Sequence, residues 1–144
     1  MSTLSCVCLL ACVALALALT SKQDVSDNCP CCMCGPDITV TMEVDNSLKP
    51  PTFKSYIELE MAQRELIYFL QEAAIYDQYF HFTAEYFTSD AVIGFFIMSM
   101  NKLAGTTEDK TYWQILDKGI PTPSGVSMYV PTDGSVITFN FTTY

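Results

Sequence analysis

Four closely spaced cysteines have the clearest capacity for chemistry in this sequence. Cys29, Cys31, Cys32 and Cys34 lie in the segment CPCCMCGPD, and no cysteine follows Cys34. An even number of cysteines in an oxidising compartment predicts disulfides, crosswise within the cluster or to another chain, because the adjacent Cys31 and Cys32 cannot easily pair with each other. A soft-metal site is the alternative, since closely spaced thiolates favour zinc or copper(I). We predict disulfides and no metal site.

No other group of residues in the sequence forms a catalytic constellation. The single histidine, His81, alternates with Phe80 and Phe82, which predicts a solvent-facing side chain rather than a metal ligand or general base. Glu58 and Glu60 share one face of an expected strand and indicate a solvated surface. No G-x-S-x-G or phosphate-loop motif occurs. We therefore predict a protein that is not an enzyme and has no resident cofactor.

One modification motif lies near the end of the sequence. Asn140-Phe141-Thr142 is an N-glycosylation sequon, so Asn140 is a candidate attachment site in a secreted protein. Its use depends on which face of the expected final strand Asn140 takes.

The first 20 residues have the character of a signal peptide. They read MSTLSCVCLLACVALALALT, an uncharged apolar run in which Ala16 and Ala18 fit cleavage-site positions. An N-terminal anchor is the alternative, and no later apolar run reaches spanning length. Residues 21–36 are polar and then rich in cysteine and proline, which indicates an N-terminal arm before a domain at residues 37–144.

The charge of the chain excludes one class of partner. All 16 acidic and all 7 basic residues follow the apolar leader, so the mature chain keeps the net charge of −9. An acidic chain repels phosphate backbones, which argues against nucleic-acid binding. Half of the residues are hydrophobic, which is enough for the core of one domain. We expect a secreted, extracellular protein.

From Asp37 onward the hydrophobic pattern predicts regular structure. Period-two alternation predicts strands at 38–44, 57–61, 80–86 and 136–141, with further strands at 111–116 and in the apolar run 91–100. Apolar residues at i, i+3, i+4 and i+7 from Leu66 to Ala73 predict an amphipathic helix of about four turns. Ile67, Ala74 and Tyr76 widen its expected buried face. Loops are expected at 101–109 and 119–125.

This order of elements predicts an α+β fold. We expect one long helix packed across a mixed β-sheet in a grasp-like arrangement. Tyr112, Trp113, the apolar run and the Pro-Thr-Pro loop are the candidates for a binding surface. A lone tryptophan in a small domain is more often part of the core, but aromatic residues beside a stiff loop can equally line a pocket for a large flat ligand.

Several of these segments resemble the C-terminal domain of the transcobalamin and intrinsic factor family of cobalamin carriers. The stretch TYWQILDKGIPTPSGVSMYVPTDGSVITFNFTTY is similar to the end of that domain in its YWQ strand, its TP-containing loop with a following glycine, its Tyr-x-Pro and its closing ITxNFTxY. Upstream, RELIYFLQEAA, FHF and IGFFIMSMNKLAG look like the corresponding helix and strands. The resemblance covers residues 37–144.

The resemblance implies a function and a set of contacts. In that family, cobalamin is held between a large N-terminal helical domain and this smaller domain. The resemblance therefore implies a secreted module that binds cobalamin as a carried ligand, through the apolar strand and through the segment from YWQ into the following loop. The residues implied are Val92, Ile93, Gly94, Phe95, Phe96, Ile97, Trp113, Gln114, Ile115, Leu116, Pro121, Thr122 and Pro123.

The resemblance does not extend to the helical domain, whose place in the sequence the four-cysteine arm takes. We therefore expect cobalamin binding by the chain alone, by a self-associated form linked through the cysteine cluster, or together with a separate helical-domain chain. The alternative hypothesis is a non-enzymatic extracellular interaction module that reuses the fold without binding cobalamin.

Overall fold

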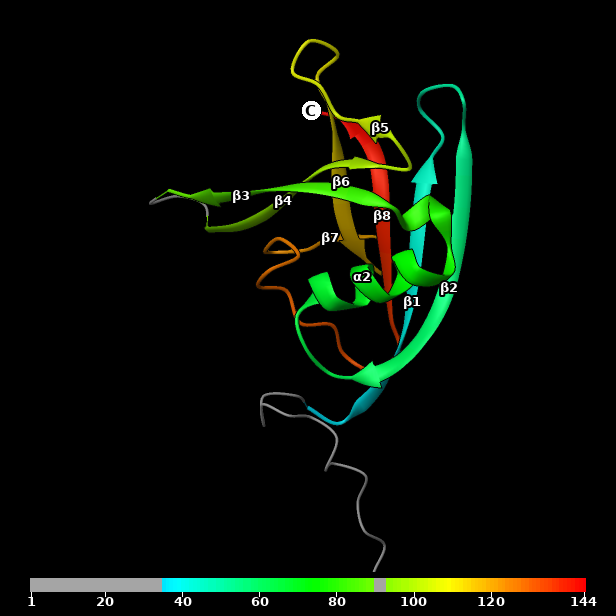
Figure 1. Ribbon diagram of the computed structural model, residues 1–144, viewed down its shortest axis with the longest axis vertical. Coiled ribbons are helices and arrows are strands. Elements are labelled where there is room, and N and C mark those ends of the chain that lie inside the picture. Colours follow the sequence, from blue (N-terminus) through cyan, green and yellow to red (C-terminus); the bar gives the residue numbers. More distant parts are fainter. Residues whose placement is uncertain (1–34, 90–92) are drawn as a thin grey trace, which may run out of the picture. The chain divides into compact units, whose positions relative to one another are not determined.

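The computed structural model describes residues 35–89 and 93–144 (Figure 1). The predicted signal peptide, Cys29, Cys31, Cys32, Cys34 and Val92 therefore lie outside the described residues. The elements, in chain order, are β1 (Asp37–Asn46), β2 (Phe53–Ala62), α2 (Leu66–Tyr76), η2 (Gln78–Phe80), β3 (Phe82–Thr88), β4 (Ile93–Met100), β5 (Leu103–Ala104), β6 (Thr111–Asp117), β7 (Ile120–Pro121) and β8 (Ser135–Thr143).

The strands form a mixed sheet with one helix against it, so the predicted α+β class is confirmed. The larger sheet has the order β2-β1-β8-β6-β7, in which β1 and β8 pair in parallel and the other pairs are antiparallel. A second sheet, β3-β4-β5, was not expected as a separate unit. The grasp-like detail stays a prediction.

The core lies between the larger sheet and α2. Alternate residues of β1 and β8 point into it, and Val40, Met42, Ile137 and Phe139 are fully buried. Burial of each such side chain contributes about 1.5–3 kcal/mol. The period-two pattern in the sequence therefore identified the core face of both central strands.

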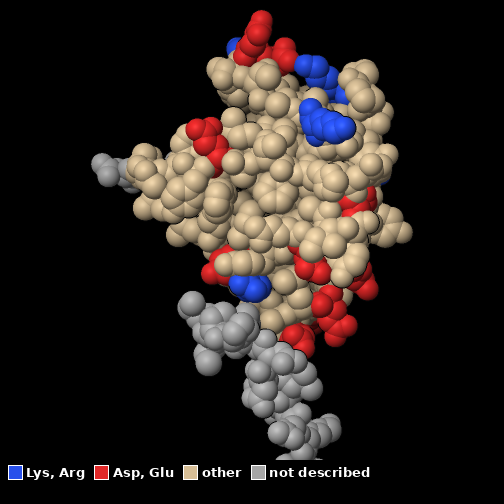
Figure 2. Space-filling view, in the orientation of Figure 1, with Lys and Arg blue, Asp and Glu red and all other residues tan. Residues whose placement is uncertain are grey.

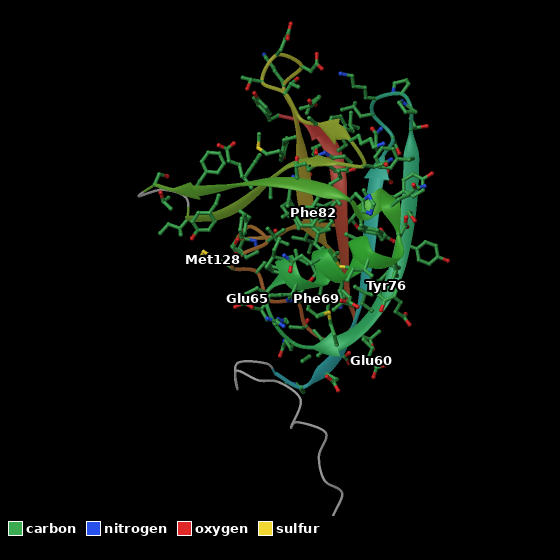
Figure 3. The ribbon with its side chains drawn as sticks, viewed as in Figure 1. Glu60, Glu65, Phe69, Tyr76, Phe82 and Met128 are labelled. Carbon is green, nitrogen blue, oxygen red and sulfur yellow. The ribbon has the colours of Figure 1, made fainter. Side chains whose placement is uncertain are left out.

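Helix α2 covers this core with the predicted stripe. Leu66, Phe69, Leu70 and Ala73 are fully buried, and Figure 3 labels Phe69 on the helix. The helix has 11 residues, so it is about one turn shorter than predicted. The expectation that Tyr76 is buried is wrong, because this last helical residue lies beside the open edge of β2 and is 66% exposed.

Two short hairpins replace parts of the expected loops. Asn101 and Lys102, with φ of 46° and 66°, form the tight turn that returns β4 into β5. Lys118 and Gly119, with φ of 50° and 79°, return β6 into β7. Positive φ at both turn residues suits two-residue hairpins. These turns connect β4 to β5 and β6 to β7.

Candidate ligand-binding site

A cavity of about 410 Å³ lies between β4, β6 and residues 121–128. Two strands and a loop supply its walls. None of its lining residues carries a charge, so the surface combines apolar and aromatic groups with hydroxyl, amide and backbone polar groups. The lining residues are Ile93, Gly94, Phe95, Phe96, Ile97, Tyr112, Trp113, Gln114, Ile115, Pro121, Thr122, Pro123, Ser124, Gly125, Ser127 and Met128.

The structure brings together 11 of the 13 residues that the resemblance implied. Leu116 lies on β6, where it pairs with Pro121, but it does not line the cavity. Val92 is outside the described residues. Contact between these residues and cobalamin stays a prediction. Tyr112, a candidate from the sequence, also lines the cavity, whereas sequence reasoning missed four lining residues, namely Ser124, Gly125, Ser127 and Met128.

An open strand edge forms one wall of the cavity. β6 pairs with β8 along one edge, but β7 covers its other edge only at Leu116 and Asp117. Thr122 N–H donates to Ile115 O at 3.0 Å, so the odd-numbered residues of β6 direct their backbone groups to this side. Within the described residues, the N–H and C=O of Trp113 have no strand partner there. Trp113 is among the residues that line the cavity at this edge.

The Trp113 side chain belongs mainly to the core. It is 3% exposed, its Nε1–H donates to Leu103 O at 2.9 Å, and its ring lies 4.9 Å from that of Phe141. Its buried neighbours confirm the interpretation of the lone tryptophan as a core residue. Trp113 is nevertheless one of the residues that line the cavity, so its fluorescence can report on occupancy.

The β3–β4 hairpin exposes aromatic rings beside the cavity, and it projects from the rest of the described residues in Figure 1. Phe95 and Phe96 are 42% and 45% exposed. Each ring meets an aromatic ring of β3 edge-on, with centroids 5.0 Å apart for Tyr86–Phe95 and 6.3 Å apart for Phe87–Phe96. Because Phe95 and Phe96 are consecutive strand residues, these two ring pairs lie on opposite faces of the hairpin.

The segment 121–130, which we call the pocket loop, is hydrogen-bonded to β4 and to α2. Ser127 Oγ accepts from Phe95 N–H of β4 at 2.8 Å. Carbonyl groups of Val126 and Tyr129 accept from Ile67 N–H and Leu66 N–H at 2.9 and 2.8 Å. Because no side chain caps α2, the pocket loop serves as its N-terminal cap. Met128 projects from the loop near β4 and is 66% exposed (Figure 3).

The carboxylate of Asp117 links the pocket loop to β6. Asp117 accepts from Tyr129 OH at 2.7 Å, from Ser135 Oγ at 2.9 Å and from Val136 N–H at 3.1 Å. The hydrogen bond to Asp117, together with partial burial, raises the pKa of Tyr129 to about 12. The phenol therefore stays protonated and holds the loop across the neutral pH range.

The other candidate residues are not part of this cavity. His81 is exposed between the buried Phe80 and the half-buried Phe82, as predicted. Asn140 is half-buried on β8 and pairs with Asp45 and Gln114 of the neighbouring strands. Its glycosylation stays a prediction. Over residues 35–89 and 93–144, there is no cluster of three potential metal-ligating side chains, and no helix is long and apolar enough to cross a membrane.

The chain is similar in sequence to proteins that are named for binding cobalamin. The chain is 33% identical over 111 residues to cobalamin binding intrinsic factor of Canis lupus familiaris, 30% to that of Mus musculus and 32% to that of Homo sapiens. Each match covers 75% of this chain and 26% of the relative, in its C-terminal part. The resemblance stated from the sequence is thus confirmed. The chain spans about a quarter of the length of these relatives.

Solved structures share the fold. Haptocorrin in complex with Cbi matches with a TM-score of 0.61 and 22% identity, over 76% of this chain and 26% of that one. A putative metal binding protein from Ruminococcus gnavus matches with a TM-score of 0.59 and 13% identity, over 74% of this chain and 98% of that one. No family model matches. The intrinsic factor relatives are named for binding, in agreement with the prediction of a protein that is not an enzyme.

Proposed function

We propose that this chain binds cobalamin, with its corrin ring against the cavity between β4, β6 and the pocket loop. The observation that carries the proposal is the composition of this cavity. A corrin presents a flat apolar face and a rim of amide groups. The apolar and aromatic part of the lining fits the face, and Gln114 with the polar backbone groups of the β6 edge fits the rim.

The absence of charge in the lining supports the same ligand class. A charged ligand would need a counter-charge to offset its desolvation, whereas neutral amides need only hydrogen-bond partners. The relatives named for binding cobalamin do not favour the alternative of an interaction module that has lost the ligand. We further propose that the chain acts outside the cell, as its apolar leader predicts.

The cavity is open, so this chain supplies one side of a binding site. A ligand held on one side buries less surface while losing the same freedom of movement, and affinity falls accordingly. We propose that a second surface completes the site, provided by a separate helical-domain chain or by a second copy linked through Cys29, Cys31, Cys32 or Cys34.

Titration with cyanocobalamin tests the proposal on the full chain. Trp113 is the only tryptophan, and it is one of the residues that line the cavity, so occupancy is expected to quench its fluorescence and to shift the corrin absorbance. Both signals should saturate together at one ligand per chain. An unchanged spectrum at high micromolar ligand contradicts binding by the chain alone. Addition of reductant then distinguishes a disulfide-linked form from the monomer.

A further inference from the structure

The edge of the larger sheet at β2 forms a second surface, remote from the proposed cobalamin site. β2 is the first strand in the order β2-β1-β8-β6-β7, so within residues 35–89 and 93–144 only one of its edges is paired. It runs for ten residues, and no proline or glycine interrupts it. A long open edge of this kind is a template for strand addition by another chain.

The hydrogen bonds beside β2 identify which backbone groups point outward. Gln63 N–H donates to Pro36 O, and Gly35 N–H donates to Gln63 O, both at 2.8 Å, so residue 63 faces β1. Because an antiparallel ladder alternates, the odd-numbered residues of β2 bond to β1 and the even-numbered ones face away. Among the residues that the structure describes, these outward groups have no backbone partner. They belong to Lys54, Tyr56, Glu58 and Glu60.

A hollow of about 510 Å³ follows this edge. Residues 57–61 of β2 form one side, and Glu72 and Tyr76 of α2 form the other. Figure 3 shows Tyr76 on α2 and Glu60 on β2 at the same side of the molecule. The hollow leaves room beside the open backbone groups for an added strand.

The two sides of an added strand would have different surroundings. Towards α2 lie the half-buried side chains of Ile57 and Met61, which favour apolar contacts. On the opposite face of the sheet, Glu58 and Glu60 are exposed at successive outward positions. Figure 2 shows acidic side chains gathered over β2 and α2. Opposite charges on directly paired strand residues attract, and like charges repel.

We propose that the β2 edge binds, by strand addition, an extended segment of another protein in which Lys or Arg alternates with apolar residues. The apolar side chains enter the hollow beside Ile57 and Met61. The basic side chains lie next to Glu58 and Glu60. The backbone of the segment bonds to the even-numbered residues of β2.

Neither this chain's own arm nor a second copy has the chemistry of that occupant. Residues 21–34 contain one basic residue, Lys22, against Asp24 and Asp27. Two copies would each bring a net charge of −9, and their glutamates would meet at one seam. Lys54 would offset little of this repulsion, because its Nζ already lies 3.2 Å from Asp45.

The test uses the full chain and the probe peptide acetyl-Lys-Val-Lys-Val-Lys-Val-Lys-amide. Binding should slow amide hydrogen exchange at Tyr56, Glu58 and Glu60 and leave Ile57 and Leu59 unchanged, since the latter already bond to β1. In an antiparallel addition, the lysines lie opposite Glu58 and Glu60, so their N–H groups make the bonds to β2. A peptide N-methylated at each lysine, with the same charge, should therefore bind at least tenfold more weakly.

Variants separate strand addition from general attraction between charges. The double variant Glu58→Gln/Glu60→Gln should weaken peptide binding at least fivefold, whereas Glu108→Gln, an exposed carboxylate on another loop, should change it less than twofold. Equal binding of the N-methylated peptide, or absence of the alternating protection, overturns the proposal. So does sedimentation that shows a dimer of the wild-type chain that becomes stronger in the double variant, because a second copy would then be the occupant of this edge. Cobalamin binding is measured separately, so the two proposals fail independently.

Discussion

Gly94 of β4 lies so close to Ser127 of the pocket loop that a Cβ at residue 94 would be 2.8 Å from Ser127 Cβ. The φ of Gly94 is +127°, a conformation that side-chain-bearing residues rarely adopt. The contact brings Ser127 Oγ to the Phe95 N–H, which would otherwise face the open side of β4. Two walls of the cavity are therefore joined at one small residue.

Replacement of this glycine should cost stability. In Gly94→Ala, the backbone strain and the contact with Ser127 should together lower the free energy of unfolding by about 1–3 kcal/mol. Urea denaturation followed by Trp113 fluorescence measures the change. Gly125→Ala is the matched control, because its Cβ would meet only Phe95 O, at 3.7 Å. Equal losses for the two variants would contradict this account.

Removal of the Ser127 hydroxyl should weaken the attachment of the pocket loop to β4 while the Cβ of residue 127 stays in place. Ser127→Ala keeps the Cβ but leaves the Phe95 N–H without its acceptor, at a cost of about 0.5–1.5 kcal/mol. Exchange of the Phe95 amide hydrogen should become faster, and cobalamin affinity should fall. Ser124→Ala, in the same loop, should leave the Phe95 amide unchanged. Unaltered Phe95 exchange in Ser127→Ala would show that the hydrogen bond does not hold the loop.

The exposed ring of Phe96 should matter for the ligand more than for folding. In Phe96→Ser, we expect unfolding free energy to change by less than about 1 kcal/mol, because the ring is 45% exposed, while cobalamin affinity falls about tenfold. Equilibrium titration and thermal unfolding of the same preparation measure both quantities. Tyr56→Ser, at a residue 74% exposed on β2, should alter neither. A loss of affinity in both variants would argue against the cavity as the site.

The link between Tyr129 and Asp117 predicts a dependence of stability on alkaline pH. The pKa of Tyr129 is raised to about 12, above the value of about 10 of an unfolded tyrosine. Its hydrogen bond therefore contributes fully below pH 10, and the contribution is lost as the pH rises towards 12. The stability difference between the wild type and Tyr129→Phe should shrink over that range, as measured by urea unfolding. Tyr56→Phe should show no such trend.

The sequence alone predicted the strands and the helix in which the spacing of apolar residues determines which side chains are buried. Val40, Met42, Ile137 and Phe139 follow that rule, and each is fully buried. It did not predict β5 and β7, because their turns place Asn101, Lys102 and Lys118 at positive φ, which such residues seldom adopt. Alternation identifies the buried face of a strand but not its neighbour, so the division into two sheets was not visible.

The candidate site was predictable only in part, and for a related reason. Resemblance indicated the two strands and the Pro-Thr-Pro loop that meet at the cavity. The role of Ser127 depends on the backbone of Gly94, which lies 33 residues earlier in the chain (127 minus 94). Ser127 was missed for that reason. The open edge at Trp113 was missed because β7 ends after two residues, a length that periodicity cannot give.

The parallel pairing of β1 with β8 has a consequence for how the chain reaches this structure. Val40 pairs with Ser135 and Asp45 with Asn140, so the centre of the larger sheet joins segments about 95 residues apart. A ribosome must release residues 135–143 before that centre can close, and until then the edge of β1 that pairs with β8 has no strand beside it. Contacts of such long sequence separation slow folding. Chaperone binding during synthesis is therefore expected at β1, and it should end only when the last strand emerges.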